Sequence, residues 1–343
     1  MHEYAILANP GHNRIYFDAA ITIAKSELMA ILNSAGVVLR EFIDEDIGLP
    51  ACIRFSTQNT IDSHGMKAIA SASIFYALFE VCENGLLKPF KAPDIYTFPS
   101  GMSQILKYVG KTNEQFTRMM INLAVSACKT NTETLRLLDP MCGKGTTLYE
   151  GFIRGFHVEG IEINKKWAQE IQTYVVQFLK KGRYKHKVVK EKRNGKDGKK
   201  LADGFSLDTA ADKKDYQAGN VQHFKLFPAD TRFANFLVKK NSCDILVSDL
   251  PYGVQHGNKQ ASDVKMERSA IELLKEAVPA WKICLKSKGA MVLSFNEFTM
   301  KREKVANVLS ENGLTVMNEA PYIDYLHRVD QSINRNLIVA VKK

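Results

Sequence analysis

Apolar residues recur along the chain with two periods, one typical of strands and one typical of amphipathic helices. In the first hundred residues these patterns predict three short strands and two longer helices. In chain order they are strand 4–7, helix 17–32, strands 37–43 and 52–56, and helix 63–82. This order predicts a small α+β domain over residues 1–98, which the proline-containing segment 88–100 joins to the rest.

After residue 100 the pattern becomes an alternation of apolar strands and helices. Strands are predicted at 135–138, 158–162, from 223 and at 243–248, with helices that end near Gly155 and begin near Asn164. A helix at 266–285, a strand at 290–295, a helix at 301–311 and strands at 314–319 and 336–341 follow. The alternation predicts an α/β fold, with a Rossmann-like sheet over residues 99–343.

The first of these strands runs into a glycine turn, Asp139-Pro-Met-Cys-Gly-Lys-Gly-Thr146, and then into a helix. The backbone N–H groups of such a turn and the helix N-terminus can hold a small cofactor. The next strand ends at Glu162, which in a doubly wound sheet lies beside the turn and can accept hydrogen bonds from ribose hydroxyls. The whole context therefore predicts an adenosine-containing cofactor.

Two phosphate-binding motifs do not fit this turn. A P-loop requires four residues between its first glycine and Gly-Lys-Ser/Thr, whereas Lys144 alone separates Gly143 from Gly145. A nicotinamide dinucleotide fingerprint requires a third glycine where Leu148 stands. The remaining interpretation is an adenosine without a pyrophosphate, and S-adenosylmethionine is the commonest such cofactor.

A second loop, Ser248-Asp-Leu-Pro-Tyr-Gly253, also directly follows an apolar strand. Alone, it is typical of a polar turn. It also has the residue types needed to present an exocyclic amine to an electrophile. Together with the glycine turn, it predicts amino-group methylation.

The two loops resemble motifs of a known enzyme family. The glycine turn is similar to the first motif of amino-methylating class I methyltransferases, and Asp249-Leu-Pro-Tyr252 is similar to their catalytic motif. The run 248–257 most resembles the RNA guanine-N2 methyltransferases that usually carry a THUMP RNA-binding domain, and 110–116 resembles their cofactor lid. The resemblance covers about residues 100–343. Leu250 replaces the usual first proline, and the preceding region is too short for a full N-terminal domain plus a THUMP.

The resemblance implies a seven-stranded methyltransferase sheet whose last strand is antiparallel, after an N-terminal domain that is loosely ferredoxin-like. It implies that Asp230 binds the adenine amino group, although Asp230 could also cap a helix that starts at Thr231. The residues implied to contact S-adenosylmethionine are Asp139, Pro140, Cys142, Gly143, Gly145, Thr146, Glu162, Ile163, Asp230, Thr231 and Asp249.

The same resemblance assigns catalytic roles to the second loop. The Asp249 carboxylate and the Leu250 carbonyl would accept the hydrogens of the target amine. Pro251 would fix the loop by locking φ, and Tyr252 would stack on the extruded base. No strong base is required, so most of the rate should come from positioning and electrostatics.

Composition agrees with a two-domain globular protein of 343 residues. Apolar runs are too short for a membrane span, and the N-terminus has no signal pattern, so we expect a cytoplasmic protein without a membrane partner. The six cysteines form no Cys-x-x-Cys pair and the eight histidines show no metal spacing, which argues against a zinc site or a disulfide framework.

Positive charge is concentrated in one segment. Residues 180–200 contain eleven Lys or Arg and two acids, so this segment carries +9 of the net +10 of the chain. It lies in an insertion at about 181–220, where Asn194-Gly195 could turn a hairpin or the segment could be disordered. The run either contacts an RNA backbone or is a solvated loop. The candidate contacts are Lys185, Lys187, Lys190, Lys192 and Arg193.

These observations predict an S-adenosylmethionine-dependent enzyme that methylates an exocyclic base amine in RNA, with guanine N2 of tRNA as the first candidate, and hence a role in tRNA modification. Methylation of adenine N6 in DNA or RNA is an alternative, because related loops perform that chemistry. A noncatalytic RNA-binding protein on a methyltransferase scaffold is another. The sequence does not define the oligomeric state.

Overall fold

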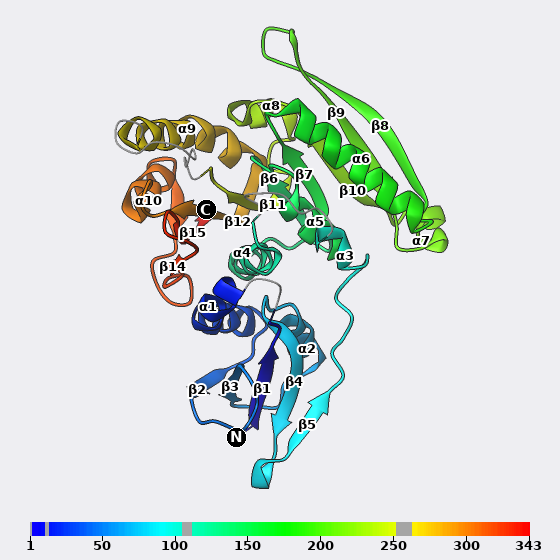
Figure 1. Ribbon diagram of the computed structural model, residues 1–343. Coiled ribbons are helices and arrows are strands. Elements are labelled where there is room, and N and C mark those ends of the chain that lie inside the picture. The colour runs from blue at the N-terminus through cyan, green and yellow to red at the C-terminus, as the bar shows by residue number, and fades with distance from the viewer. Residues whose placement is uncertain (1, 11–13, 105–111, 252–262) are drawn as a thin grey trace.

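The computed structural model describes residues 2–10, 14–104, 112–251 and 263–343 (Figure 1). Its strands form two sheets, one of five strands and one of ten. The smaller sheet uses strands from the first ninety residues, and the larger one uses strands from residue 136 onward. No helix in the described part of the chain is both long and apolar enough to cross a bilayer.

The N-terminal unit has a βαββαβ order, followed by one further strand. Every neighbouring pair in its sheet, whose order is β2-β3-β1-β4-β5, is antiparallel. Helices α1 and α2 complete the unit. The elements are β1 (His2–Ala8), α1 (Arg14–Ser34), β2 (Leu39–Ile43), β3 (Cys52–Thr57), α2 (Ser63–Ala70), β4 (Phe75–Val81), the 3-10 turn η1 (Glu83–Gly85) and β5 (Leu87–Phe90).

The predicted helix over 63–82 is wrong in its second half. Helix α2 ends at Ala70, and the chain then forms β4, which pairs with β1 along its length. The segment 75–81 is rich in aromatic residues, which favour strands. Pairing with β1 satisfies its backbone groups and buries Leu78, so tertiary context decides between helix and strand.

The larger sheet has a seven-strand centre with the order β13-β15-β12-β11-β6-β7-β10. Strands β10, β7, β6, β11 and β12 are parallel, and β15 inserts antiparallel between β12 and β13. The strands are β6 (Arg136–Asp139), β7 (His157–Ile161), β10 (Gln222–Phe227), β11 (Cys243–Asp249), β12 (Leu285–Asn296), β13 (Leu314–Val316) and β15 (Asn334–Lys342), with β14 (His327–Arg328) beside β15. This arrangement is the predicted Rossmann-like methyltransferase sheet.

Helices cover both faces of this sheet (Figure 1). One apolar layer joins it to α4, α5 and α6, and the other joins it to α8, α9 and α10. Strand β11 illustrates the pattern, because Ile245 and Val247 face one layer while Leu246 faces the other. The helices are α3 (Gly101–Gln104), α4 (Glu114–Ala127), α5 (Thr146–Ile153), α6 (Lys165–Lys181), α8 (Ala234–Leu237), α9 (Asp263–Cys284) and α10 (Arg302–Glu311).

The basic insertion forms a hairpin instead of a disordered loop. Strand β8 (His186–Asn194) pairs with β9 (Lys200–Thr209), β9 adds antiparallel to β10, and a short helix α7 (Lys213–Ala218) follows. Gly195 N–H donates to the Lys199 carbonyl at 2.8 Å and closes the turn. Phe205 and Leu207 are buried, and Phe205 stacks on Phe224 of β10. Apolar packing therefore anchors the hairpin to the sheet.

The N-terminal unit contacts the larger sheet through α1, which packs on α4. The buried Glu27 carboxylate of α1 accepts hydrogen bonds from the Asn122 amide of α4 and from Ser73. Burial raises the pKa of Glu27. A second link is the Gln115 amide, which donates to the Asn9 carbonyl at 3.1 Å. Helix α4 is therefore held on both sides, by the sheet and by the N-terminal unit.

Candidate active site

Four acidic residues predicted from the sequence lie where four adjacent parallel strands end. Asp139 ends β6, Glu162 follows β7, Asp230 follows β10 and Asp249 ends β11. Because parallel strands share one carboxyl edge, these side chains gather along that edge. Two backbone bonds link the ends of β7 and β10: Glu162 N–H donates to the Phe227 carbonyl, and Ala229 N–H donates to the Glu162 carbonyl.

The glycine turn after β6 has the backbone geometry that its glycines predict. Gly143 and Gly145 have φ angles of 53° and 89°, in the left-handed region that favours glycine. Gly145 is the N-cap of α5, and Cys142 N–H donates to the Ile161 carbonyl of β7. A Cβ on Gly143 would meet no atom within 4 Å, so the turn faces open space.

Asp139 is buried beneath this turn. Its Oδ1 accepts a hydrogen bond from Ser248 Oγ at 2.8 Å and from Met141 N–H at 3.1 Å. Burial raises the pKa of Asp139 to about 7, although hydrogen bonds from Ser248, Met141 and Thr147 favour its charged form. Ser248 immediately precedes Asp249, so one hydroxyl connects the glycine turn to the second loop.

Glu162 and Ile163 lie at the end of β7. Glu162 Oε1 accepts a hydrogen bond from Asn164 N–H at 2.7 Å, and Gly143 N–H also donates to this carboxylate. Burial raises the pKa of Glu162. Ile163, the next residue, is 71% exposed. A carboxylate acceptor beside an exposed apolar side chain suits the ribose and the adenine of a nucleoside.

Asp230 caps the turn that follows β10, as one of its two predicted roles requires. That turn is the 3-10 helix η2 (Thr231–Phe233), and Asp230 Oδ1 accepts from Arg232 N–H at 2.9 Å. The Arg232 guanidinium also binds the carboxylate, with Nη2 at 2.6 Å from Oδ2, and lowers the pKa of Asp230. The Thr231 hydroxyl accepts a hydrogen bond from Trp281 Nε1 of α9 at 2.8 Å.

Asp249 receives a hydroxyl on each carboxylate oxygen. Thr112 Oγ1 donates to Oδ2 at 2.6 Å, and Ser294 Oγ of β12 donates to Oδ1 at 2.8 Å. Sequence reasoning missed both partners. Thr112 lies in the segment that resembles a cofactor lid, but the resemblance assigned no role to this residue. Ser294 is 45 residues from Asp249, and only the pairing of β11 with β12 places it there.

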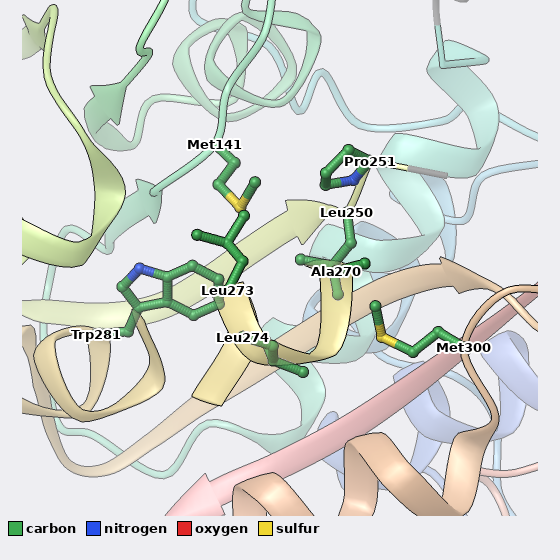
Figure 2. Close-up of a pocket in the computed structure, with 8 residues that line it drawn as sticks. All are labelled: Met141, Leu250, Pro251, Ala270, Leu273, Leu274, Trp281 and Met300. Carbon is green, nitrogen blue, oxygen red and sulfur yellow. The ribbon is translucent and has the colours of Figure 1, made fainter. Parts of the chain in front are cut away.

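Leu250 and Pro251 continue the loop after Asp249. Leu250 N–H donates to the Ser294 carbonyl at 2.9 Å, and the Leu250 side chain is buried. Figure 2 shows Leu250 and Pro251 beside Met141 of the glycine turn in a small apolar pocket. The rest of its lining is Ala270, Leu273, Leu274, Trp281 and Met300. The leucine at this motif position therefore anchors the loop through its side chain. The catalytic prediction for Tyr252 lies outside the described residues.

Cys142 and Thr146 have structural positions within the turn. Both are buried, and burial raises the pKa of the Cys142 thiol well above its usual value. A neutral, buried thiol is a poor nucleophile, so Cys142 contributes packing. Pro140 is buried at the start of the turn. In the described part of the chain, no three potential metal ligands cluster in a way that could hold an ion.

Residues 107–315 match the model of the UPF0020 family, described as the RMKL-like methyltransferase domain, over well over half of the chain. The chain belongs to this methyltransferase family. It is accordingly an S-adenosylmethionine-dependent methyltransferase. No curated protein matches the sequence.

Solved structures that are similar to this chain include two methyltransferases. One is the TehB-like SAM-dependent methyltransferase from Corynebacterium glutamicum, with 14% identity, a TM-score of 0.36, and coverage of 67% of this chain and 97% of that chain. The other is the ribosomal protein L11 methylase from Lactobacillus delbrueckii subsp. bulgaricus, with 11% identity, a TM-score of 0.36, and coverage of 67% and 80%.

Proposed function

We propose that this enzyme methylates an exocyclic amine of an RNA base, and that its target is guanine N2 in tRNA. The observation that carries the proposal is the Asp249 carboxylate, fixed by hydroxyls from Thr112 and Ser294 at the strand end next to the glycine turn. A rigid acceptor at this point suits the hydrogens of a planar amine. The sequence from Ser248 to Gly257 supports the choice of RNA guanine.

The chain's own residues position the amine. The lone pair of an aromatic amine is delocalised into the ring, so the nitrogen is a poor nucleophile until its hydrogens are held. Asp249 accepts one hydrogen, and the Leu250 carbonyl accepts the other. S-adenosylmethionine supplies a methyl group on a sulfonium that is a good leaving group. As the amine nitrogen bonds to the methyl carbon, the carbon–sulfur bond would break and its electron pair would stay on sulfur as a neutral thioether. The nitrogen then loses one proton to Asp249 or to water, and no strong base is required.

The cofactor contacts follow the same proposal. Glu162 would accept the ribose hydroxyls, Ile163 would cover the adenine, and the Gly143–Gly145 turn would approach the amino acid moiety. Asp139, buried beneath the turn, would fix Met141 and Ser248 so that the two loops keep their separation. Most of the rate would then come from orientation and from acceptors arranged before the reaction.

The test is a nucleoside analysis by mass spectrometry of tRNA incubated with the enzyme and isotopically labelled S-adenosylmethionine. We expect label in N2-methylguanosine. Asp249→Ala should lower turnover by about 10² or more while cofactor affinity stays within a few fold, because Asp249 acts chiefly in the transition state.

Label in N6-methyladenosine would replace guanine by adenine as the target, and label in added DNA or protein alone would contradict the choice of RNA. Near-normal turnover of Asp249→Ala would mean that the loop is only a structural turn and that Asp249 does not position the amine. The matched control is Asp44→Ala, which removes the charge of an exposed aspartate directly after β2 in the N-terminal unit.

A further inference from the structure

The basic hairpin projects beyond the same sheet edge that carries the active site. Strand β9 runs antiparallel to β10, and their pairing ends where Phe205 meets Leu226, near the carboxyl end of β10. Beyond that point β8 and β9 pair only with each other, up to Asn194 and Lys200. Figure 1 shows this two-stranded extension reaching past the sheet. The tip therefore extends on the carboxyl side of the sheet, the side on which Asp139, Glu162 and Asp249 lie.

A glycine marks the point of departure. A Cβ on Gly204 would lie 2.3 Å from the Leu226 carbonyl oxygen and 2.6 Å from the Phe227 ring, so only glycine permits β9 to pass this close to β10. Opposite Ala202, two residues nearer the tip, Arg193 lies over the Phe227 ring, donates to the Leu237 carbonyl and pairs with Glu191. Arg193, predicted from the sequence to contact RNA, is thus already occupied in holding the hairpin.

Two other predicted lysines lie exposed on the hairpin. Lys190 and Lys192 are exposed, and within the described ranges neither has a carboxylate within ion-pair distance. Their cross-strand partners are Phe205 and Asp203, so both lysines lie on the face of the hairpin that Phe205 shares with α6. Lys200 is paired with Asp203 instead.

The first turn of α6 continues this positive face toward the glycine turn. The pKa of Asp203 is lowered by Lys200 first and also by Lys192 and by Lys165, the first residue of α6. Lys165 is exposed and begins α6, which packs on the same apolar cluster as Phe205 of the hairpin. Two residues after Lys165, Trp167 is 38% exposed on the side of α6 that faces Lys144 of the glycine turn.

Lys144 connects Trp167 to the glycine turn itself. Its ammonium lies 5.8 Å from the centre of the Trp167 ring and 3.0 Å from Glu170 Oε2. Since Glu170 neutralises it, Lys144 is suited to holding the indole and not to binding a phosphate. Exposed lysines and an exposed indole thus lie in succession from the hairpin to the glycine turn. Lys144 stands between Gly143 and Gly145 of that turn.

We propose that Lys190, Lys192, Lys165 and Trp167 form a track that guides a single-stranded segment of the RNA substrate toward the active site. The lysines contact phosphates, and Trp167 stacks on an unpaired base. Alternating cations and an aromatic surface are the usual means of binding single strands. Five strand spacings, or about 24 Å, separate β8, which carries Lys190 and Lys192, from β11, so a short extended strand can bridge the distance. This proposal rests on the proposed RNA substrate.

The first test measures the affinity for a labelled unstructured RNA oligonucleotide by fluorescence anisotropy. We compare the native protein with Lys190→Glu/Lys192→Glu. The matched control is Lys213→Glu/Lys214→Glu, which changes the same charge on exposed residues of α7, at the other end of the hairpin. Two lost phosphate contacts should lower the slope of log affinity against log salt by about 1.4. The affinity of the native protein divided by that of the variant should therefore be about sevenfold larger at about 50 mM than at about 200 mM salt.

The second test separates stacking from charge. Trp167→Ala should weaken RNA binding by about fivefold or more with an unchanged salt slope, and Trp167→Phe should restore most of the affinity. S-adenosylmethionine affinity, measured by calorimetry, should be unchanged in the hairpin variant, because β9, β10 and β7 separate β8 from β6 and its glycine turn.

Four results would overturn the track. An equal loss in the α7 control would mean that only net charge matters. Binding of polyglutamate as strong as that of RNA, with the same loss in Lys190→Glu/Lys192→Glu, would assign the surface to an acidic protein. Unchanged RNA affinity in that variant, while the native enzyme still labels RNA, would refute the track and leave the proposed function intact. Labelling of DNA or protein in place of RNA would refute both.

Discussion

Replacement of Asp139 by asparagine should remove a pH dependence from the stability of the protein. The side chain is buried, and burial raises its pKa from 3.8 to about 7. Ser248 Oγ and Met141 N–H both donate to one carboxyl oxygen, and an amide oxygen can accept the same two hydrogen bonds. The amide in the Asp139→Asn variant would thus copy the protonated acid at every pH, whereas the native carboxyl must ionise as the pH rises.

The sign follows from the two pKa values. Between about pH 4 and pH 7 the folded protein keeps a proton on Asp139 that the unfolded chain has released. The stabilising contribution is therefore complete below pH 4 and is lost as the pH rises through 7. The interval is about three pH units, and at about 1.4 kcal/mol per unit the total is about 4 kcal/mol. Between pH 5 and pH 7 the native protein should lose about 2–3 kcal/mol relative to Asp139→Asn.

Urea unfolding followed by tryptophan fluorescence measures this difference. The two tryptophans, Trp167 and Trp281, lie on α6 and α9, so the signal reports on the part of the protein that contains Asp139. Asp244→Asn is the matched control. Asp244 is equally buried, but bonds from Lys286 and Thr132 lower its pKa, so its variant should show an offset that is constant from pH 5 to pH 8. A constant offset for Asp139→Asn as well would refute the reasoning.

Two further changes probe the cofactor site and its support. Glu162→Ala should weaken S-adenosylmethionine binding by about 1–3 kcal/mol in calorimetry, since charge-assisted hydrogen bonds are lost, and unchanged affinity would remove Glu162 from the site. Gly160→Ala should lower the free energy of unfolding by about 1–3 kcal/mol, because its Cβ would lie 2.5 Å from Leu148 Cδ1. Gly101→Ala, whose Cβ meets nothing within 4 Å, should be nearly neutral in the same urea titration.

The carboxyl edge of the sheet was predictable because its signals are local. An apolar strand followed directly by a glycine turn or an acid identifies Asp139, Glu162 and Asp249 as residues at strand ends. In a parallel sheet all such ends meet at one edge, so three separate local patterns predict one site. The order of the strands could be predicted only with the resemblance to the methyltransferase family, since no local sequence pattern indicates that β15 lies between β12 and β13.

The partners of Asp249 could not be predicted, because they depend on tertiary contacts. Ser294 is one of many serines, and its hydroxyl reaches Asp249 only through the register of β11 with β12, in which Asp249 lies opposite it. The strand β4 was missed for a related reason. Its sequence suits a helix or a strand, and the exposed edge of β1 decides between them.

The hairpin was predictable only in part from the sequence. Asn194-Gly195 suggested a turn, and the sequence left a hairpin and disorder open. The decisive signal is the alternation in β9, where Phe205, Leu207 and Thr209 are buried and the residues between them are more exposed. That alternation only identifies an ordered strand once a partner such as β10 is known to offer an edge. The charge pattern alone also hid the difference between Arg193, which packs on Phe227, and Lys190, which is exposed.

Asp230 shows how two predicted roles compete for the same atoms. A carboxylate has about four lone-pair sites, and Arg232 already fills most of them through its backbone N–H, Nε and Nη2. Binding of an adenine amino group by this carboxylate would therefore require Arg232 to withdraw in part. Arg232 also contacts Glu276 of α9 through Nη1 at 2.8 Å, so its guanidinium has a second carboxylate available when it moves. Capping through the backbone N–H does not depend on that movement, so the cap can persist while the adenine contact forms.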